Sequence, residues 1–331
     1  MILQPAVLAL LAASCLSALV MLPACVFALQ LLLQWDPASG SERQIRLEKM
    51  TYLVSTQVAF VAAVELVSLA AFAFNADRMS ALFVGAMCAV GTLNASVYGF
   101  PTLFAKIAVF FVTFVWLILD RTDACGRDYP FIRQKYFGIL LLGPLIILES
   151  GLQLAYFVDL KTATITSCCG KLFGDSGREA GADIAGMNPK LALGLLVVGL
   201  SITIALAVFA PKSRLAARLL GLASPAAFII AIAAVISVIS VHVYEQPHHH
   251  CPFCLLKREY GYFGFMLYIP LFAATGTGMS AGLMAALPER ASLAGPMPQL
   301  LRRLSLVTML GLLAFGGLSL WAVTMSRLAL T

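Results

Sequence analysis

The chain has 331 residues, of which 61% are hydrophobic and 11% are charged. Soluble domains carry about 25% charged residues, so this composition excludes a soluble globular protein and predicts an all-α, polytopic transmembrane helix bundle. The formal net charge of +6 includes no long basic run, which argues against nucleic-acid binding and fits loops that contact membrane lipid head groups.

Eight hydrophobic segments are long enough for a membrane helix, which takes about 20 apolar residues. We predict spans at 6–33, 52–74, 80–119, 137–160, 191–210, 219–244, 262–287 and 304–328. The third segment is too long for one crossing, and Gly99-Phe100-Pro101 interrupts it. We therefore expect either two short spans, which would make nine, or one span with a re-entrant or surface helix. Lys106 lies just after this break, and its charge favours a position near water or a cavity for this part of the segment.

The hydrophobic segments fill most of the chain, so we predict a single integral membrane domain over residues 1–331. Basic residues cluster at 43–49, 121–135, 212–218 and 290–303. The positive-inside rule places these loops in the cytoplasm. The loops 161–190 and 245–260 are then extracytoplasmic, in what we expect to be a bacterial or archaeal cytoplasmic membrane.

A sparse repeat with a spacing of 84 residues relates two of the predicted spans. Its members are Arg43, Tyr52, Glu65 and Phe72, which correspond to Arg127, Tyr136, Glu149 and Tyr156. A parallel repeat places both preceding basic loops on one side of the membrane and favours eight crossings. Glu65 and Glu149 fall near mid-span, where an ionised side chain costs about 3 kcal/mol on insertion scales. They indicate a proton path, a quinone contact or an ion path, or else protonated glutamates that hydrogen-bond to a neighbouring helix.

All four histidines and two of the eight cysteines lie between residues 242 and 262. Pro252 favours the first position of a helix, so Cys251 is predicted at the N-cap and Cys254 one turn further on the same side. The helix N-terminus and protonated histidines nearby would stabilise a thiolate. We therefore predict Cys251 as a nucleophile and Cys254 as its resolving partner.

The adjacent Cys168 and Cys169 lie in the long loop 161–190, which the predicted orientation puts on the same oxidising face. Three hypotheses follow. The two cysteine pairs exchange disulfides with an extracytoplasmic thiol protein, or they bind copper or zinc delivered by a metal carrier, or they cross-link the loops of a structural subunit in a larger complex. The metal hypothesis takes its ligands from Cys168, Cys169, Cys251, Cys254, His248, His249 and His250.

The segment Cys251-Pro252-Phe253-Cys254-Leu255-Leu256-Lys257-Arg258 leads into a predicted span and resembles the reactive segment of the disulfide-bond formation protein B family. The resemblance implies a membrane thiol oxidoreductase that oxidises an extracytoplasmic thiol protein and reduces a membrane quinone. It implies that Cys251 and Cys254 are the quinone-proximal pair, that Arg258 lies beside the quinone, and that Cys168 and Cys169 face the substrate. The likeness covers these eight residues and supports a mechanism, not membership.

Four further cysteines lie outside these two stretches. Cys15, Cys25 and Cys88 are predicted inside spans, with Cys15 and Cys25 as small buried hydrophobic side chains, and Cys125 is predicted in a cytoplasmic loop. Of these, Cys88 is the candidate for a thiol relay inside the bilayer. The leading hypothesis is electron transfer between thiols and a quinone, with soft-metal binding as the alternative and a structural subunit as the third.

Overall fold

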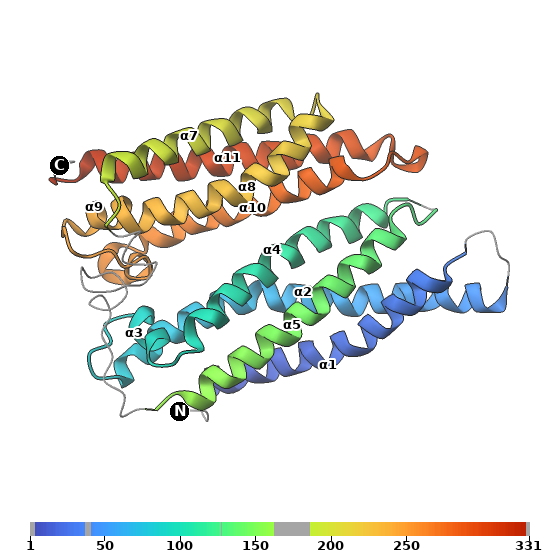
Figure 1. Ribbon diagram of the computed structural model, residues 1–331, viewed down its shortest axis with the longest axis horizontal. Coiled ribbons are helices and arrows are strands. Elements are labelled where there is room, and N and C mark those ends of the chain that lie inside the picture. The colour runs from blue at the N-terminus through green and yellow to red at the C-terminus, as the bar shows by residue number, and fades with distance from the viewer. Residues whose placement is uncertain (1–3, 37–40, 127, 162–185, 329–331) are drawn as a thin grey trace. The chain divides into compact units, whose positions relative to one another are not determined.

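The computed structural model describes residues 4–36, 41–126, 128–161 and 186–328 (Figure 1). Eight of its helices are long and apolar enough to cross a membrane, which confirms the prediction of a polytopic helical membrane protein. They are α1 (Pro5–Gln34), α2 (Glu42–Met79), α4 (Gly99–Asp123), α5 (Ile132–Asp159), α7 (Pro189–Phe209), α8 (Arg214–Ala234), α10 (Phe263–Ala286) and α11 (Pro296–Met325). Helix α8 continues through the π-helical turn η2 (Val235–Ile239) into α9 (Ser240–Tyr244) and makes one span with them.

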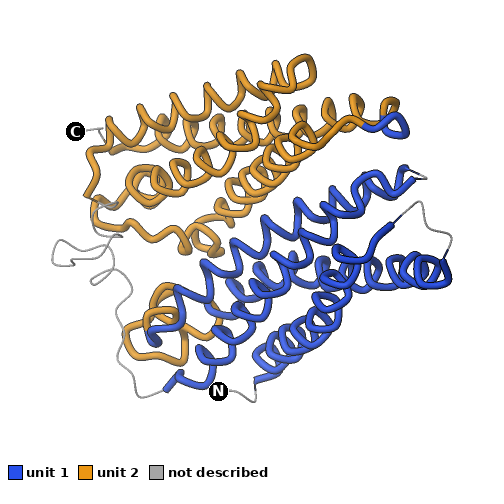
Figure 2. The backbone as a smooth tube through the Cα atoms, turned by 45° about the vertical axis from the view of Figure 1, so that its right-hand side comes forward, with its two compact units in different colours: residues 1–76, 95–162, 290–293 blue, residues 77–94, 163–289, 294–331 orange. Residues whose placement is uncertain are grey.

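The helices form two compact units (Figure 2). Unit 1 consists of residues 1–76, 95–162 and 290–293, and contains α1, most of α2, α4 and α5. Unit 2 consists of residues 77–94, 163–289 and 294–331. In unit 2, α7 packs on α8, α8 on α10, α10 on α11 and α11 on α7, so these helices form a closed four-helix bundle.

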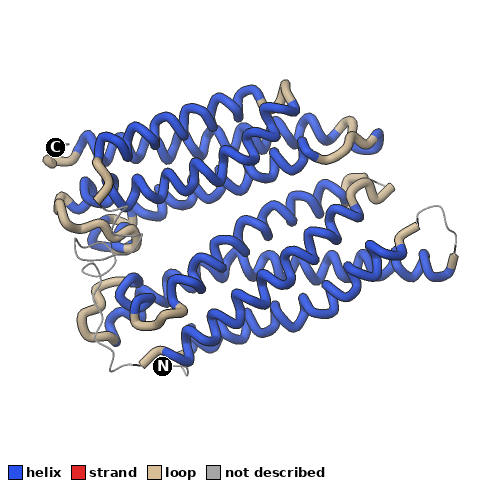
Figure 3. The backbone as a smooth tube through the Cα atoms, viewed as in Figure 1, coloured by secondary structure: helices blue, strands red, loops and turns tan. Residues whose placement is uncertain are grey.

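The long third hydrophobic segment contains one span and not two. It begins with the 3-10 turn η1 (Ser80–Leu82) and the short helix α3 (Ala89–Asn94), and the span α4 starts at Gly99. Pro101 is tolerated in the first turn of α4 because its missing N–H has no partner to lose there. The described residues contain helices and loops without a strand (Figure 3).

Unit 1 is held together by an apolar core to which all four of its helices contribute. Phe27 on α1, Val58 on α2, Val109 on α4 and Ile139 on α5 belong to one buried cluster. The outer faces are hydrophobic as well, and Leu19 on α1 remains 64% exposed. Helices that are apolar all round are typical of membrane spans, because lipid covers the outer face.

Helices α2 and α5 run parallel to each other in unit 1. The Phe72 ring packs edge-on against Tyr156, with ring centroids 5.6 Å apart. Glu65 and Glu149, two helical turns earlier in each helix, interact electrostatically. Both pairs have the 84-residue spacing of the predicted repeat, so two of its four residue pairs meet, and α2 and α5 begin at the same end of unit 1.

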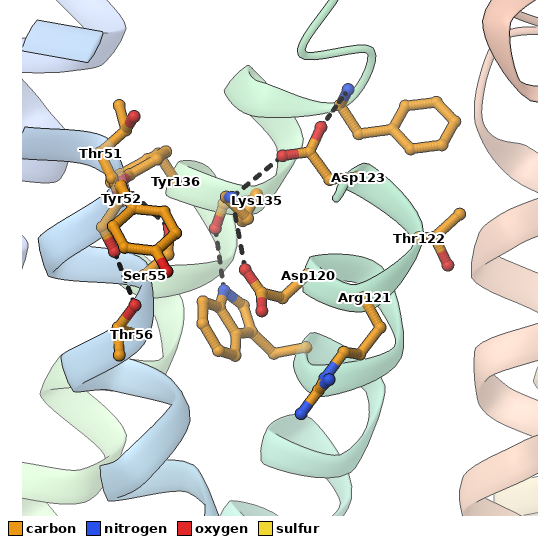
Figure 4. A network of polar contacts seen from close by, with 12 residues as sticks. Thr51, Tyr52, Ser55, Thr56, Asp120, Arg121, Thr122, Asp123, Lys135 and Tyr136 are labelled. Carbon is orange, nitrogen blue, oxygen red and sulfur yellow. Dashed lines mark hydrogen bonds and ion pairs between the residues drawn. The ribbon is translucent and has the colours of Figure 1, made fainter. Parts of the chain in front are cut away.

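A buried ion pair closes the hairpin between α4 and α5. Lys135 Nζ lies 2.9 Å from Asp123 Oδ2 and 3.3 Å from Asp120 Oδ1 (Figure 4). Asp123 Oδ1 also accepts a hydrogen bond from the Phe131 backbone N–H at 2.9 Å, and the Trp116 indole donates to the Lys135 carbonyl at 3.0 Å. These contacts join both helix ends and the turn between them.

Replacing Lys135 with methionine should lower the free energy of unfolding by about 3 kcal/mol, because Asp123 would stay buried without its cation. The side chain of Asp123 is only 2% exposed. The measurement is SDS-induced unfolding of the purified protein in mixed micelles. The control is Arg46→Met, which removes an exposed ion pair with Glu42 and should change stability by less than about 0.5 kcal/mol. Equal effects of the two variants would show that burial of the Lys135 ion pair adds nothing to the free energy of unfolding.

Candidate metal centre

Three cysteines of unit 2 bring their sulfur atoms together. The Sγ atoms of Cys88, Cys251 and Cys254 all lie within 4.8 Å of one another. Cys88 Sγ is 3.3 Å from Cys251 Sγ, far longer than the about 2.05 Å of a disulfide bond, so the two meet as thiols. The three residues are buried, with exposed fractions of 0%, 0% and 5%.

Two tyrosine hydroxyls hold the loop that carries Cys251 and Cys254. Tyr244, at the end of α9, donates a hydrogen bond to the Cys251 carbonyl at 2.6 Å. Tyr268, in α10, donates to the Pro252 carbonyl at 2.8 Å. The helices on both sides of the loop therefore anchor its backbone, and the two cysteine side chains lie in the protein interior.

The loop forms 3-10 turns and not the α-helix that the sequence predicts. The turn η3 (Cys254–Leu256) has Phe253 as its N-cap, and η4 (Arg258–Tyr260) follows. Cys251 is therefore not a helix N-cap. The carbonyls of Cys251 and Pro252, which would accept backbone hydrogen bonds inside a helix, accept tyrosine hydroxyls instead. A three-residue turn lacks the aligned peptide dipoles on which the predicted thiolate stabilisation depends.

Helix α10 begins directly against this loop. A Cβ atom added to Gly264 would lie 2.9 Å from the backbone carbonyl carbon of Leu255, so only glycine allows this approach. The chain enters α10 through Gly261 and Tyr262, which have φ angles of 61° and 56°. Two successive left-handed residues reverse the chain and place Leu255, next to Cys254, against the first turn of α10.

Cys88 reaches the cluster from the connection between η1 and α3. The Lys257 ammonium donates a hydrogen bond to the Met87 carbonyl and lies 3.8 Å from Asp77 Oδ1. The same Asp77 oxygen accepts a hydrogen bond from the Ala89 backbone N–H at 3.3 Å. The backbone on both sides of Cys88 is therefore tied to the end of the cysteine loop.

The surroundings of Cys251 favour its neutral thiol. Hydrogen bonds with Cys254 and with Cys88, together with burial, raise the pKa of Cys251 well above its ordinary value. These surroundings do not stabilise the nucleophilic thiolate that we expected at Cys251. A bound metal ion would favour the thiolate of Cys251 instead, because a coordinated thiol is deprotonated.

We expect Cys251 to resist alkylation in the folded protein. Iodoacetamide reacts with thiolates, and Cys251 is buried with a raised pKa, whereas Cys125 is exposed after α4. Cys125 should react at least about ten times faster, since each pKa unit lowers the thiolate fraction tenfold. Timed labelling with peptide mass spectrometry measures both rates, and SDS-unfolded protein is the control in which they should become similar. Equal rates in the folded protein would support a reactive thiolate.

The three consecutive histidines lie near the cysteine loop but outside the sulfur cluster. His248 is exposed. The His249 ring packs against Tyr244 with centroids 4.3 Å apart. His250 Nδ1 lies 3.0 Å from the carbonyl of Ile236 in the π-helical turn η2. Among the described residues, the group of potential ligands within 4.8 Å of one another contains cysteines and no histidine.

The other predicted site residues have different locations. Cys168 and Cys169 lie outside the described residues. Arg258 is exposed. Glu65 and Glu149 belong to unit 1, where they interact with each other in the interior.

Cys88 is the site residue that the sequence misplaced. The sequence puts it inside a span, whereas it lies in the loop before α3 with its sulfur against Cys251. The two cysteines are 163 residues apart in the chain, and hydrophobic periodicity describes only local structure, so no sequence signal joins them. Cys88 is buried, whereas the expectation that Cys15 and Cys25 are buried is wrong, because Cys15 is exposed and Cys25 half-buried.

No protein-family model, curated protein or solved structure matches this chain. The resemblance to the disulfide-bond formation protein B family therefore rests on its eight residues alone. The function has to be argued from the geometry and chemistry of the site.

Proposed function

We propose that this integral membrane protein binds a soft metal ion, Cu(I), through the thiolates of Cys88, Cys251 and Cys254. The observation that supports the proposal is the meeting of three buried sulfurs within 4.8 Å of one another. A metal ion about 2.3 Å from each sulfur would separate the sulfurs by about 3.8 to 4.0 Å. The 3.3 Å between Cys88 and Cys251 needs only a small opening to reach that spacing.

The ligand set favours a soft monovalent ion. Thiolates select Cu(I) and Zn(II) over hard cations such as Mg²⁺ and Ca²⁺. The described cluster offers three sulfurs, which suffice for Cu(I), whereas zinc takes four ligands and would need one more from water or from another residue. Cu(I) is therefore the ion that we propose, with Zn(II) as the competitor.

A buried set of three thiolates with Cu(I) carries excess negative charge. Lys257 supplies a positive charge close to it, because its ammonium is held at the Met87 carbonyl, next to Cys88. Its side chain is only 24% exposed, so solvent screens this charge incompletely. We assign Lys257 the role of a charge partner that lowers the energy of the loaded site.

The role that we propose is metal handling at the membrane. A buried thiolate site between two loops suits an ion that is received from a carrier and kept away from water and oxidants. The predicted orientation puts loop 245–260 outside the cytoplasm, so we propose an extracytoplasmic metal carrier as the partner.

The test is elemental analysis of the detergent-purified protein after anaerobic loading with Cu(I) and, separately, with Zn(II). We expect one copper per chain, and copper that remains bound after gel filtration. Loading that leaves no stoichiometric copper on the protein would overturn the proposal.

Thiol–disulfide electron transfer is the second candidate, and the 3.3 Å contact between Cys88 and Cys251 favours it. Oxidation of two thiols to a disulfide releases two electrons and two protons, which would reduce a membrane quinone to the quinol. A disulfide between Cys251 and Cys254 would have the Cys88 thiol beside it as an exchange partner. Disulfide formation that depends on added quinone in metal-free protein would favour this candidate over the metal site.

A further inference from the structure

Apart from the Lys135 ion pair at the helix ends, three charge-bearing side chains come together in the interior of unit 1. Lys106 on α4, Glu149 on α5 and Glu65 on α2 have exposed fractions of 2%, 0% and 2%. Lys106 Nζ lies 2.6 Å from Glu149 Oε1 and donates a hydrogen bond to Ser68 Oγ on α2 at 2.7 Å. Ser17 on α1 hydrogen-bonds with the Glu65 carboxyl group. All four helices of the unit therefore contribute to one polar cluster.

The cluster lies well inside the spans. A helix rises about 1.5 Å per residue, which places Lys106 about 10 Å from the start of α4 and Glu149 about 15 Å from the end of α5. The Phe72 ring covers the ammonium, with its centroid 5.5 Å from Lys106 Nζ, and Tyr156 packs against the same ring. Lys106 therefore does not lie at the surface, and its ion pair with Glu149 allows it to be buried.

Two carboxyl groups compete for the single ammonium group. Glu149 has Lys106 as its ion-pair partner, while Glu65 is repelled by Glu149 and attracted by Lys106. Glu65 Oε1 and Glu149 Oε2 are both buried and have no hydrogen-bond partner among the described residues. A second carboxylate without a cation would cost several kcal/mol in this interior. The stable cluster therefore contains one ionised glutamate, one protonated glutamate and the lysine cation.

The charged groups on the surrounding helices lie near the helix ends. Helix α1 has no acidic or basic side chain. The other acidic and basic residues of α2, α4 and α5 are Glu42, Arg43, Arg46, Glu48, Lys49, Asp77, Arg78, Asp120, Arg121, Asp123, Arg133, Lys135 and Asp159. Cys25 on α1 and Tyr156 on α5 are neutral at physiological pH. The charge state of the cluster is therefore set by its own three members.

We propose that Glu65 and Glu149 form an intramembrane proton-binding site, in which one proton is shared between the two carboxyl groups and Lys106 pairs with the ionised one. The ion pair of Lys106 with Glu149 assigns the proton to Glu65 in this structure. Transfer of the proton to Glu149 would release the ammonium to pair with Glu65, so the net charge of the cluster stays the same. Buried carboxyls with a mobile proton are typical of proton relays in membrane proteins.

A proton suits this site better than a metal cation does. Hard cations take about six oxygen ligands, whereas the described oxygens here are two carboxyl groups and the hydroxyls of Ser17 and Ser68. Lys106 already supplies one positive charge, so a proton completes neutrality without further ligands. The site uses residues of unit 1 only and does not depend on the cysteine site of unit 2.

Infrared spectroscopy of the C=O stretch of protonated carboxyl groups tests the proposal on the purified full-length protein at neutral pH. The wild type should show the band of a buried protonated carboxyl, and Glu65→Gln should lose it. Glu149→Gln should lose it as well, because Glu65 would then ionise to pair with Lys106. Lys106→Met should double the band, since both glutamates would be protonated. A cluster in which both glutamates are ionised would show no band in the wild type and none of these changes.

Glu289→Gln is the matched control, because the Glu289 side chain is 82% exposed and pairs with Arg214, a residue of unit 2. Glutamine has almost the shape of glutamic acid, and circular dichroism confirms that each variant keeps its helices. A wild type without the band, or a band that survives both Glu65→Gln and Glu149→Gln, would overturn the proposal. Loss of the band on adding NaCl at constant pH would also overturn it, since the site would then bind sodium.

Discussion

Replacing Lys106 with methionine should lower the free energy of unfolding by about 3 to 5 kcal/mol, the largest effect on stability that we expect from a single substitution. The ammonium group lies 2.6 Å from Glu149 Oε1 and 2.7 Å from Ser68 Oγ, and its side chain is 1% exposed. Without it, the ionised Glu149 must either stay charged in a low-dielectric interior or take up a proton of its own. SDS-induced unfolding in mixed micelles, followed by circular dichroism, measures the loss.

A second substitution shows whether the loss arises from unpaired charge. Lys106→Met combined with Glu149→Gln removes both partners of the ion pair and should recover most of the stability. Arg46→Met is the surface control, because the Arg46 and Glu42 side chains are 79% and 94% exposed. If the double variant is as unstable as Lys106→Met alone, the loss of stability arises from lost packing and not from the unpaired charge.

The spans could be predicted because hydrophobicity over about 20 residues is a local property. The span predicted at 191–210 is α7 (Pro189–Phe209), and the break predicted at Gly99-Phe100-Pro101 is the start of α4. The stretch before that break could not be predicted from its composition. Residues 80–98 are apolar, yet they form short turns and α3, because apolar loops that are buried in protein have the same composition as a span.

The cysteine loop and the buried ion pair of Glu149 show a similar limit of prediction from sequence. Pro252 is a local helix-start signal, and it fails because the hydroxyl of Tyr268, 16 residues further along the chain, takes the Pro252 carbonyl. Glu149 could be singled out as a mid-span carboxylate, but its pairing with Lys106 depends on how α4 and α5 pack. Residue type therefore singled out candidate side chains, whereas their partners were determined by tertiary contacts that periodicity does not encode.

Replacing Cys251 with serine should lower the affinity for Cu(I) by at least about 100-fold, the largest effect that we expect on binding. A serine hydroxyl does not ionise near neutral pH, and its hard oxygen is a poor ligand for a soft ion. Cys88→Ser and Cys254→Ser should have similar effects, because the three sulfurs lie within 4.8 Å of one another and act as one site. Anaerobic competition with a chromogenic Cu(I) chelator measures the affinity.

Matched cysteine variants and a change at the charge partner test whether the loss is specific. Cys15→Ser and Cys125→Ser remove exposed thiols and should leave the affinity unchanged. Lys257→Met removes the charge held beside Cys88 and should weaken binding by about 10- to 100-fold, as changes in the outer shell of a metal site do. Equal losses in all of these variants would mean that copper binds to unfolded or surface thiols.

The substitution Cys88→Ser distinguishes most clearly between metal binding and thiol–disulfide electron transfer. Cys88 is an obligatory ligand of a three-thiolate site, whereas a disulfide between Cys251 and Cys254 forms without it. The metal proposal therefore predicts that Cys88→Ser loses copper. Replacement of His248, His249 and His250 by alanine should leave copper binding intact, since none of them belongs to the described sulfur cluster. If Cys88→Ser binds copper as well as the wild type does, and Cys251 and Cys254 cycle with added quinone, the cysteine loop is a redox site.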